Sequence, residues 1–258
     1  MDGPHGAALS AEDFGLKGPR GWAFRGVGFT AAPGSLVAVQ GPSGSGRTCL
    51  LLALTGRMRS TQGRAEVGGE RLPGRLTAVR RFSALGPVPG VNELDPSLTV
   101  AEHLRERALL RRRFDGSPRS LLRSRAERTA TARAVIDTAL EGAGLDLAAL
   151  PKAGRTSVRD LERLEALRLS VSLALMGRPR LLAVDDADLK LSPAERAPAW
   201  ELLRAIAAGG TTVLAVCDEA PEDALTVPTR PAATTAAPSD GTTTGKGTAD
   251  AITTAGRA

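Results

Sequence analysis

Short, continuous apolar runs, each ending close to a glycine or an aspartate, are the clearest pattern along the chain. Three such runs are Ser35–Gln40, Leu181–Val184 and Thr211–Val216. Runs of about four to eight residues are typical of strands that are buried on both faces of a parallel sheet. Longer stretches with leucines at helical spacing lie between them, and this alternation predicts an α/β fold.

Helix boundaries are indicated by capping residues and by glycine or proline. Thr99 and Glu102 form a capping-box pattern ahead of an Arg-rich stretch that is helical by composition, so we expect a helix to begin there. Three further helices are expected over about Ser124–Leu140, from Ser157–Asp160 through to Met176, and over Ala194–Ala208.

The two ends of the chain carry weaker patterns. Between Ser10 and Thr30 apolar residues alternate with polar or small ones, which indicates strands, and Arg64–Val67 is predicted as another short strand. From about Glu222 onward the chain consists mainly of Thr, Ala, Pro and Gly without periodicity. We therefore expect residues 226–258 to form a disordered tail.

The run that ends at Gln40 leads into a glycine-rich turn, and a helical stretch follows from Cys49. Strand, glycine-rich turn and helix in this order are the context of a phosphate-binding P-loop. The glycines permit positive φ and let backbone N–H groups approach a phosphate at the positive end of the helix. The alternative is a glycine-rich turn without a ligand. We expect nucleotide to be bound by Gly41, Pro42, Ser43, Gly44, Ser45, Gly46, Arg47, Thr48 and Cys49.

Three side chains have specific expected roles in this site. Thr48 would place its hydroxyl on Mg²⁺, and Arg47 would reach the β- and γ-phosphates, although the P-loop pattern has Lys there and Arg is bulkier. Asp185 ends a later apolar strand, where its carboxylate would support the same Mg²⁺ through water. We therefore expect Thr48 and Asp185 to form a metal site; the alternative for Asp185 is a strand-terminal turn residue.

Composition narrows the class of protein. The 258 residues, 42% of them hydrophobic, are enough for one α/β domain with an inserted subdomain. Two cysteines do not make a disulfide framework, so we expect a reducing compartment. The sequence shows neither a signal-peptide pattern nor an apolar run of the roughly 20 residues that span a bilayer. We expect the protein to be soluble or held at a membrane by a partner.

The excess positive charge is concentrated in one segment. Residues 101–133 hold ten Arg and four acidic residues, which accounts for the whole net charge of +6. The cluster Arg111–Arg113 and the nearby Arg119, Arg123 and Arg125 would suit acidic protein loops, anionic lipid headgroups or a nucleic-acid backbone. A solvated helix face explains the same residues, and the sequence does not decide between these interpretations.

The order of the segments resembles the ATP-binding cassette of ABC transporters over roughly residues 10–225. The resemblance is carried by Gly41–Thr48, Leu94–Leu104, Ala174–Asp186 and Thr211–Val216. It implies a P-loop NTPase core with a mixed sheet and an inserted helical subdomain at about residues 95–177. It also implies ATP and Mg²⁺ as ligands, a dimer with an identical or different cassette subunit, and a membrane-spanning permease partner on the cytoplasmic side of the membrane.

Several positions depart from the family's pattern. Where the family carries Leu-Ser-Gly-Gly-Gln, this chain has residues 161–165, Leu-Glu-Arg-Leu-Glu, which place negative charge beside the γ-phosphate of an opposing subunit. Gly90 stands near the position of the loop glutamine, and Asp218 stands at the switch histidine. Asp186 replaces the family's catalytic glutamate and is one methylene shorter. These changes predict that the chain hydrolyses ATP slowly or not at all.

A preserved phosphate loop beside this eroded apparatus predicts an ATP-binding transporter subunit with weak or absent hydrolysis, in which Asp186 is at best a poor catalytic base. Phe14 and Trp22 are the two candidates for stacking on adenine. One alternative is a regulatory or scaffold cassette protein with vestigial nucleotide binding. Another is a nucleic-acid-associated cassette protein, although with 3% aromatic residues and no Tyr we do not expect nucleic acid to be the partner.

Overall fold

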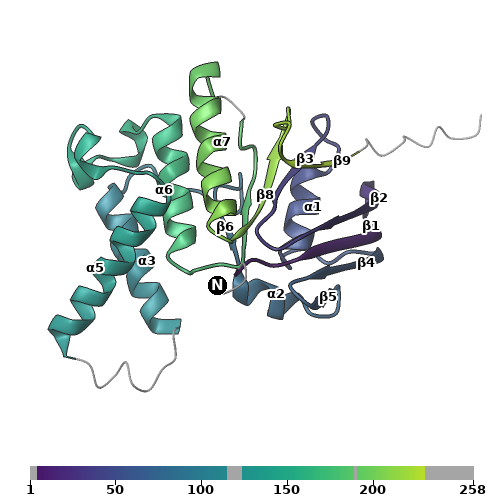
Figure 1. Ribbon diagram of the computed structural model, residues 1–258, viewed down its shortest axis with the longest axis horizontal. Coiled ribbons are helices and arrows are strands. Elements are labelled where there is room, and N and C mark those ends of the chain that lie inside the picture. The colour runs from purple at the N-terminus through teal and green to yellow at the C-terminus, as the bar shows by residue number, and fades with distance from the viewer. Residues whose placement is uncertain (1–4, 115–123, 189–190, 230–258) are drawn as a thin grey trace, which may run out of the picture.

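The computed structural model describes residues 5–114, 124–188 and 191–229, which form two sheets and the helices around them (Figure 1). One sheet is antiparallel, in the order β2-β1-β4-β5, and the other is parallel, in the order β6-β7-β8-β3-β9. The mixed sheet that we expected is thus divided into two. The strands are β1 Leu9–Gly18, β2 Gly21–Ala31, β3 Leu36–Gln40, β4 Gln62–Val67, β5 Glu70–Leu72, β6 Ser83–Leu85, β7 Leu181–Val184, β8 Thr212–Cys217 and β9 Leu225–Pro228.

The parallel sheet is covered on both faces. Alternate residues of a strand point to opposite faces, and β3 shows the consequence: Val37 and Val39 belong to one buried cluster, Leu36 and Ala38 to another. The first cluster joins the sheet to α1 and to the antiparallel sheet, and the second joins it to α6 and α7 (Figure 1). The helices are α1 Arg47–Leu54, α2 Leu76–Phe82, α3 Val100–Phe114, α5 Arg125–Gly142, α6 Arg163–Leu175 and α7 Pro193–Ala208, with 3₁₀ turns at Leu147–Ala149, Ala153–Arg155 and Val158–Asp160.

A third buried cluster holds α3, α5 and α6 together at one end of the molecule (Figure 1). The predicted capping box is present, because Thr99 exchanges hydrogen bonds with Glu102 at the start of α3. Ser124 and Glu127 form a second one, which was not predicted, at the start of α5. Residues 115–123, which include the candidate surface cations Arg119 and Arg123, lie outside the described residues. None of the helices formed by the described residues combines the length and the apolar content that a membrane span requires.

The expectation of a disordered tail from residue 226 is wrong at its start. Leu225–Pro228 forms β9, which pairs in parallel with β3 over Val37–Gln40, and Val227 is buried. The strand forms because β3 offers it a row of backbone hydrogen-bonding groups, which composition does not reveal. Residues 230–258 lie outside the described part of the chain.

The predicted start of the helix that ends near Met176 is also wrong. Val158–Asp160 forms a 3₁₀ turn, and α6 begins only at Arg163, with extended backbone at Glu162. The backbone amide of Val158 donates to the carbonyl of Leu98 at 2.9 Å, which ties this segment to the loop before α3. That tertiary contact outweighs the local helical pattern.

Candidate functional site

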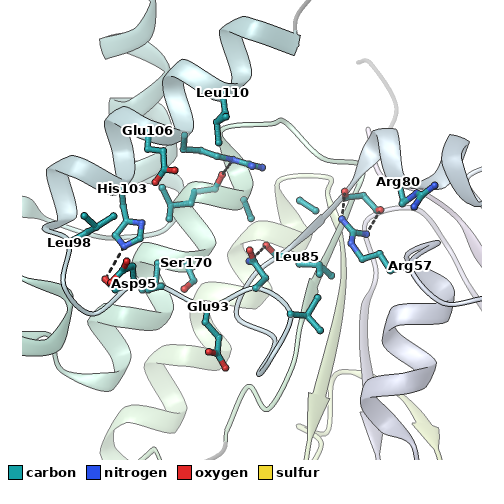
Figure 2. Close-up of a pocket in the computed structure, with 18 residues that line it drawn as sticks. Arg57, Arg80, Leu85, Glu93, Asp95, Leu98, His103, Glu106, Leu110 and Ser170 are labelled. Atoms are coloured by element: carbon teal, nitrogen blue, oxygen red, sulfur yellow. Dashed lines mark hydrogen bonds between the residues drawn. The ribbon is translucent and has the colours of Figure 1, made fainter.

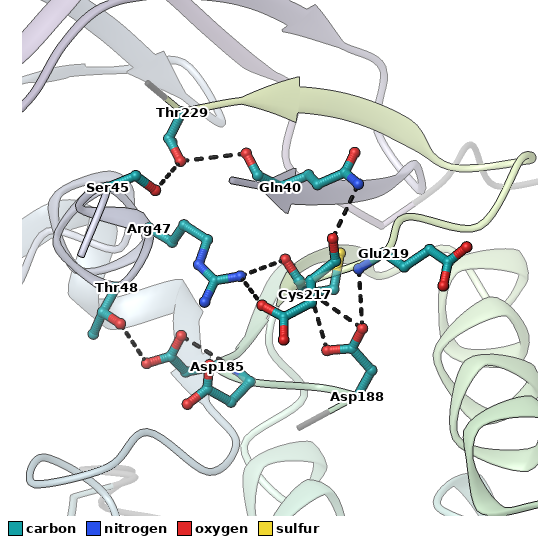
Figure 3. A network of polar contacts seen from close by, with 11 residues as sticks. Gln40, Ser45, Arg47, Thr48, Asp185, Asp188, Cys217, Glu219 and Thr229 are labelled. Carbon is teal, nitrogen blue, oxygen red and sulfur yellow. Dashed lines mark hydrogen bonds and ion pairs between the residues drawn. The ribbon is translucent and has the colours of Figure 1, made fainter. Parts of the chain in front are cut away.

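Three predicted site segments meet at one edge of the parallel sheet (Figure 3). The glycine-rich loop follows β3, Asp185 follows β7, and Asp218 follows β8. Because β7, β8 and β3 are adjacent and parallel, their carboxyl ends lie side by side. Ligands of open α/β sheets bind at this edge.

The loop between β3 and α1 has the backbone shape of a phosphate site. Pro42, Ser43 and Gly44 are exposed at its tip. Gly44 and Gly46 have φ angles of +79° and +82°. A Cβ on Gly46 would lie 2.0 Å from the carbonyl oxygen of Ala23, so this position requires glycine for close approach as well as for its φ. Gly46 is also the N-cap of α1, whose first-turn amides have no acceptor within the helix and suit an anion.

The base of the loop is held by the residue after β9, a contact that sequence analysis missed. Thr229 is buried, and its backbone amide donates to the Gln40 carbonyl at 2.7 Å. Its hydroxyl oxygen lies 2.6 Å from that of Ser45 (Figure 3). A Cβ on Gly41 would lie 2.3 Å from Thr229 Oγ1, so the contact depends on glycine there. The alternating apolar residues of Leu225–Pro228 are the sequence signal from which a strand leading to Thr229 could have been predicted.

Thr48 and Asp185 face each other across the site. Thr48 Oγ1 donates to Asp185 Oδ2 at 2.7 Å (Figure 3). Burial raises the pKa of the Asp185 carboxyl, the hydrogen bond from Thr48 opposes that rise, and the neighbouring Asp186 adds to it. A hydroxyl and a carboxylate are hard oxygen donors of the kind that Mg²⁺ prefers, and a cation would offset the cost of the buried charge. The two residues therefore fit the expected metal ion.

Arg47 is folded against the end of β8. Its Nη1 donates to the carbonyl of Cys217 at 2.7 Å and forms an ion pair with Asp218 Oδ1 at 2.5 Å (Figure 3). The Arg47 side chain is 10% exposed, whereas that of Asp218 is 62% exposed. Contact between Arg47 and nucleotide phosphates therefore remains a prediction, and the acid at the position of the switch histidine is what the guanidinium contacts here.

Two further polar side chains, neither predicted, hold the loop that carries Asp218. The backbone amides of Asp218 and Glu219 donate to Asp188 Oδ2 at 3.1 and 3.2 Å. Gln40 Nε2 donates to the carbonyl of Asp218 at 3.0 Å. Asp188 is buried, and it belongs to the segment directly after Asp185. Asp188 and Gln40 thus position the backbone from which Asp218 reaches its cation.

The start of α6, where the resemblance places contact with an opposing nucleotide, carries several acids together with Arg163. The Glu165 carboxylate accepts the backbone amide of Glu162 at 2.8 Å. Glu195, in α7, accepts hydrogen bonds from Ser192, which lower its pKa, and the backbone amide of Leu164 contributes to the same shift. Amides that would receive a phosphate therefore lie beside the chain's own carboxylates, which disfavours a second anion.

The two aromatic candidates for adenine lie in different environments. Phe14 is fully buried and packs against Phe24 with ring centroids 5.7 Å apart, so it is a core residue. Trp22 is half-buried in β2, next to the Ala23 that approaches the phosphate loop, and Lys17 Nζ lies 5.8 Å from its ring centroid. Trp22 is therefore the better candidate.

The remaining predicted residues lie around this edge. Asp186 has a φ of +49°, in the left-handed region that Asp tolerates better than most residues, and it lines a cavity of about 330 Å³ between the end of β7 and α6. Cys49 is half-buried in the first turn of α1, and burial raises the pKa of its thiol. Gly90 has a φ of +72°, and a Cβ added to it would meet no atom within 4 Å. The catalytic role of Asp186 remains a prediction.

Comparison with protein-family models matches residues 24–188 to the ABC transporter family. The chain is 31% identical over 189 residues to the Nod factor export ATP-binding protein I of Ralstonia nicotianae, a match that covers 73% of this chain and 52% of that protein. The protein of the same name from Burkholderia pseudomallei is 33% identical, with 73% and 55% covered. The chain thus spans about half the length of the curated relatives it matches.

Solved structures confirm the predicted fold class. A bacterial Atm1-family ABC exporter with ATP bound has a TM-score of 0.60 at 23% identity, covering 85% of this chain and 35% of that one. A dimeric ATP-binding cassette in a post-hydrolysis state, bound to ADP and Pi, has a TM-score of 0.60 at 21% identity, covering 82% and 88%. A nucleotide-free cassette from an ABC transporter has a TM-score of 0.63 at 17% identity, covering 83% and 81%.

Proposed function

This chain belongs to the ABC transporter family, and from that premise we propose that it is a cassette subunit that binds MgATP and hydrolyses it slowly or not at all. The observation that carries the proposal is the pairing, at one sheet edge, of a glycine-rich phosphate loop with the Thr48–Asp185 contact. Residues 41–49 would bind the phosphates, Thr48 and Asp185 would hold Mg²⁺, and Trp22 would stack on adenine. The metal would supply positive charge for the phosphate oxygens.

Slow hydrolysis follows from the groups that surround the expected γ-phosphate. Asp186 is a shorter base than the family's glutamate, and Asp218 replaces a histidine with a carboxylate that pairs with Arg47. Glu162 and Glu165 stand at the start of α6, where a phosphate-binding backbone would be needed. Catalysis of phosphoryl transfer depends on positive groups and a placed base, so these acids oppose it.

We place the membrane partner in a groove of about 670 Å³ between the helical region and the core (Figure 2). Val91 and Leu110 line it and are 55% and 42% exposed. Arg57 and Arg80 lie on its core side and Glu106 on its helical side (Figure 2). Burial, together with nearby guanidiniums, lowers the pKa of Arg57 to about 10. A permease segment with apolar residues and an acid facing the two arginines would complement this groove.

The proposal assigns residues 10–225 to the cassette domain, extended through β9 to Thr229, with about 95–177 as its helical subdomain. A second cassette subunit, identical or different, would face the phosphate loop. Through the permease the subunit would lie at the cytoplasmic face of the membrane. What is exported or imported is set by that partner.

Calorimetry with MgATP tests the nucleotide site directly. We expect saturable binding that weakens when Thr48→Ala removes the metal-facing hydroxyl, and steady-state hydrolysis at least about 10²-fold below the ~10 s⁻¹ of a typical enzyme. Absence of any binding, or turnover at that typical rate by the purified chain, would contradict the proposal.

A second candidate is a regulatory or scaffold cassette in which nucleotide binding is vestigial. It is favoured by the contact of Arg47 with Asp218 and by the hydrogen bond between Ser45 and Thr229, because both engage loop side chains within the protein. In that case Arg47→Ala leaves partner binding unchanged. The main proposal instead predicts that Arg47→Ala weakens the effect of ATP on partner binding, because ATP binds the variant less tightly.

A further inference from the structure

The cation of the phosphate loop is engaged by an acid from another strand. Arg47 Nη1 makes a hydrogen bond to the Cys217 carbonyl at 2.7 Å and an ion pair to Asp218 at 2.5 Å. These two contacts hold the guanidinium against the carboxyl end of β8 (Figure 3). The same guanidinium is the loop's positive side chain, so phosphate and Asp218 are alternative anions for one cation.

The surroundings make Asp218 a replaceable anion. Its side chain is 62% exposed, so water and salt partly screen the charge of its carboxylate. Its backbone, in contrast, is fixed by Asp188 and Gln40, so the carboxylate can turn away without moving the loop. A triphosphate carries more negative charge than one carboxylate and can displace it.

The other acids of this edge have different contacts. Asp185 accepts the hydroxyl of Thr48, and Asp188 accepts the backbone amides of the loop after β8. Arg47 forms its direct ion pair with Asp218. Its charge also lowers the pKa of Asp185, but this is the weakest influence on that carboxyl. Asp218 is therefore the carboxylate in direct contact with the guanidinium that a phosphate would need.

We propose that Asp218 is an internal counter-ion that competes with nucleotide phosphate for Arg47, and so lowers the affinity of the site for nucleotide. The inference rests on the proposed function. The coupling is reciprocal: nucleotide binding frees the Asp218 carboxylate, and any contact that draws Asp218 away from Arg47 tightens nucleotide binding by the same factor.

The test compares MgATP affinity in Asp218→Asn with that in Glu219→Gln, by calorimetry on the full chain. Asp218→Asn keeps the shape of the side chain and removes the competing charge. Glu219→Gln removes the same charge one residue away, from a side chain that points away from Arg47 (Figure 3). Because the exposed Asp218 carboxylate is partly screened by water, we expect about 2- to 5-fold tighter binding for Asp218→Asn and no change for Glu219→Gln.

A double-mutant cycle separates this effect from a structural one. In an Arg47→Ala background, Asp218→Asn should no longer change the affinity, because the cation under competition is gone. Unchanged or weaker binding by Asp218→Asn, or an equal gain with Glu219→Gln, overturns the inference while the proposed function stands. If neither the native chain nor Asp218→Asn binds MgATP, both are overturned.

Discussion

Gly44 and Gly46 have nearly the same backbone conformation but different surroundings. Both have a positive φ near +80°. A Cβ on Gly44 would meet nothing within 4 Å, whereas one on Gly46 would lie 2.0 Å from the Ala23 carbonyl oxygen. Alanine substitutions at the two positions therefore distinguish the energetic cost of a left-handed backbone conformation from that of a clash with neighbouring backbone.

We predict that Gly44→Ala lowers the free energy of unfolding by about 1–2 kcal/mol, the usual cost of a left-handed residue with a Cβ. Gly46→Ala should cost about 3 kcal/mol or more, because the same strain is joined by a clash that only backbone movement relieves. Urea denaturation of the two variants measures the difference. Equal losses would show that the close approach of β2 to the loop is not maintained.

The buried carboxyl of Asp185 gives a second prediction. Burial raises its pKa in the folded protein, so its charged form is disfavoured there. The Asp185 carboxyl therefore lowers the free energy of unfolding at pH values above its pKa in the unfolded chain. This loss of stability disappears as the pH falls below that value. Asp185→Asn should therefore leave stability at pH 7 without ligand unchanged or higher by about 0.5–1 kcal/mol.

The same variant should lose the Mg²⁺-dependent part of the stabilisation by ATP, because an amide is a poor ligand for Mg²⁺. Thermal denaturation with ATP, with and without Mg²⁺, measures both effects. If Asp185→Asn retained the full Mg²⁺-dependent shift in Tm, Asp185 would not be a metal-site residue.

At the scale of elements, the sequence predicted what local patterns encode and missed what distant contacts create. The strands before Gly41 and Asp185 and the capping box at Thr99 were confirmed because apolar runs and capping residues act locally. β9 was missed because its stability comes from β3, more than 180 residues earlier in the chain. The same holds for the candidate site. Its glycine-rich loop and Asp185 were predicted from local motifs, whereas the contacts of Thr229 with the loop were not predicted.

β9 leads to a prediction about the C-terminus. The test compares a chain that ends after Thr229, which keeps β9, with a chain that ends after Ala224, which lacks it. A chain that ends after Ala224 loses the pairing with β3 and the buried Val227, and we expect a loss of about 2–4 kcal/mol together with weaker MgATP binding. Equal stability of the two truncated chains would show that β9 does not support the phosphate loop.

At the scale of the whole molecule, we propose that the acids at the start of α6 influence which dimer this chain can form. In the ABC family this segment meets the γ-phosphate bound by the opposing subunit, and here it carries Glu162 and Glu165, with Glu195 adjacent. Two copies of this chain would place these carboxylates against both nucleotides. Like charges brought together at an interface cost several kcal/mol, so we propose a different cassette subunit as the better partner.

We therefore predict that MgATP does not convert the purified chain into a homodimer, as measured by analytical ultracentrifugation. Glu162→Ser removes the acid nearest the helix start and leaves a residue that caps helices well, so α6 should persist. Relief of even ~1.4 kcal/mol of repulsion would strengthen ATP-dependent self-association about tenfold. Glu141→Ser, at the far end of α5, removes the same charge on an exposed surface and should have no effect. An ATP-dependent homodimer of the native chain, or equal behaviour of the two variants, would mean that the acids of α6 do not face the nucleotide of an opposing subunit.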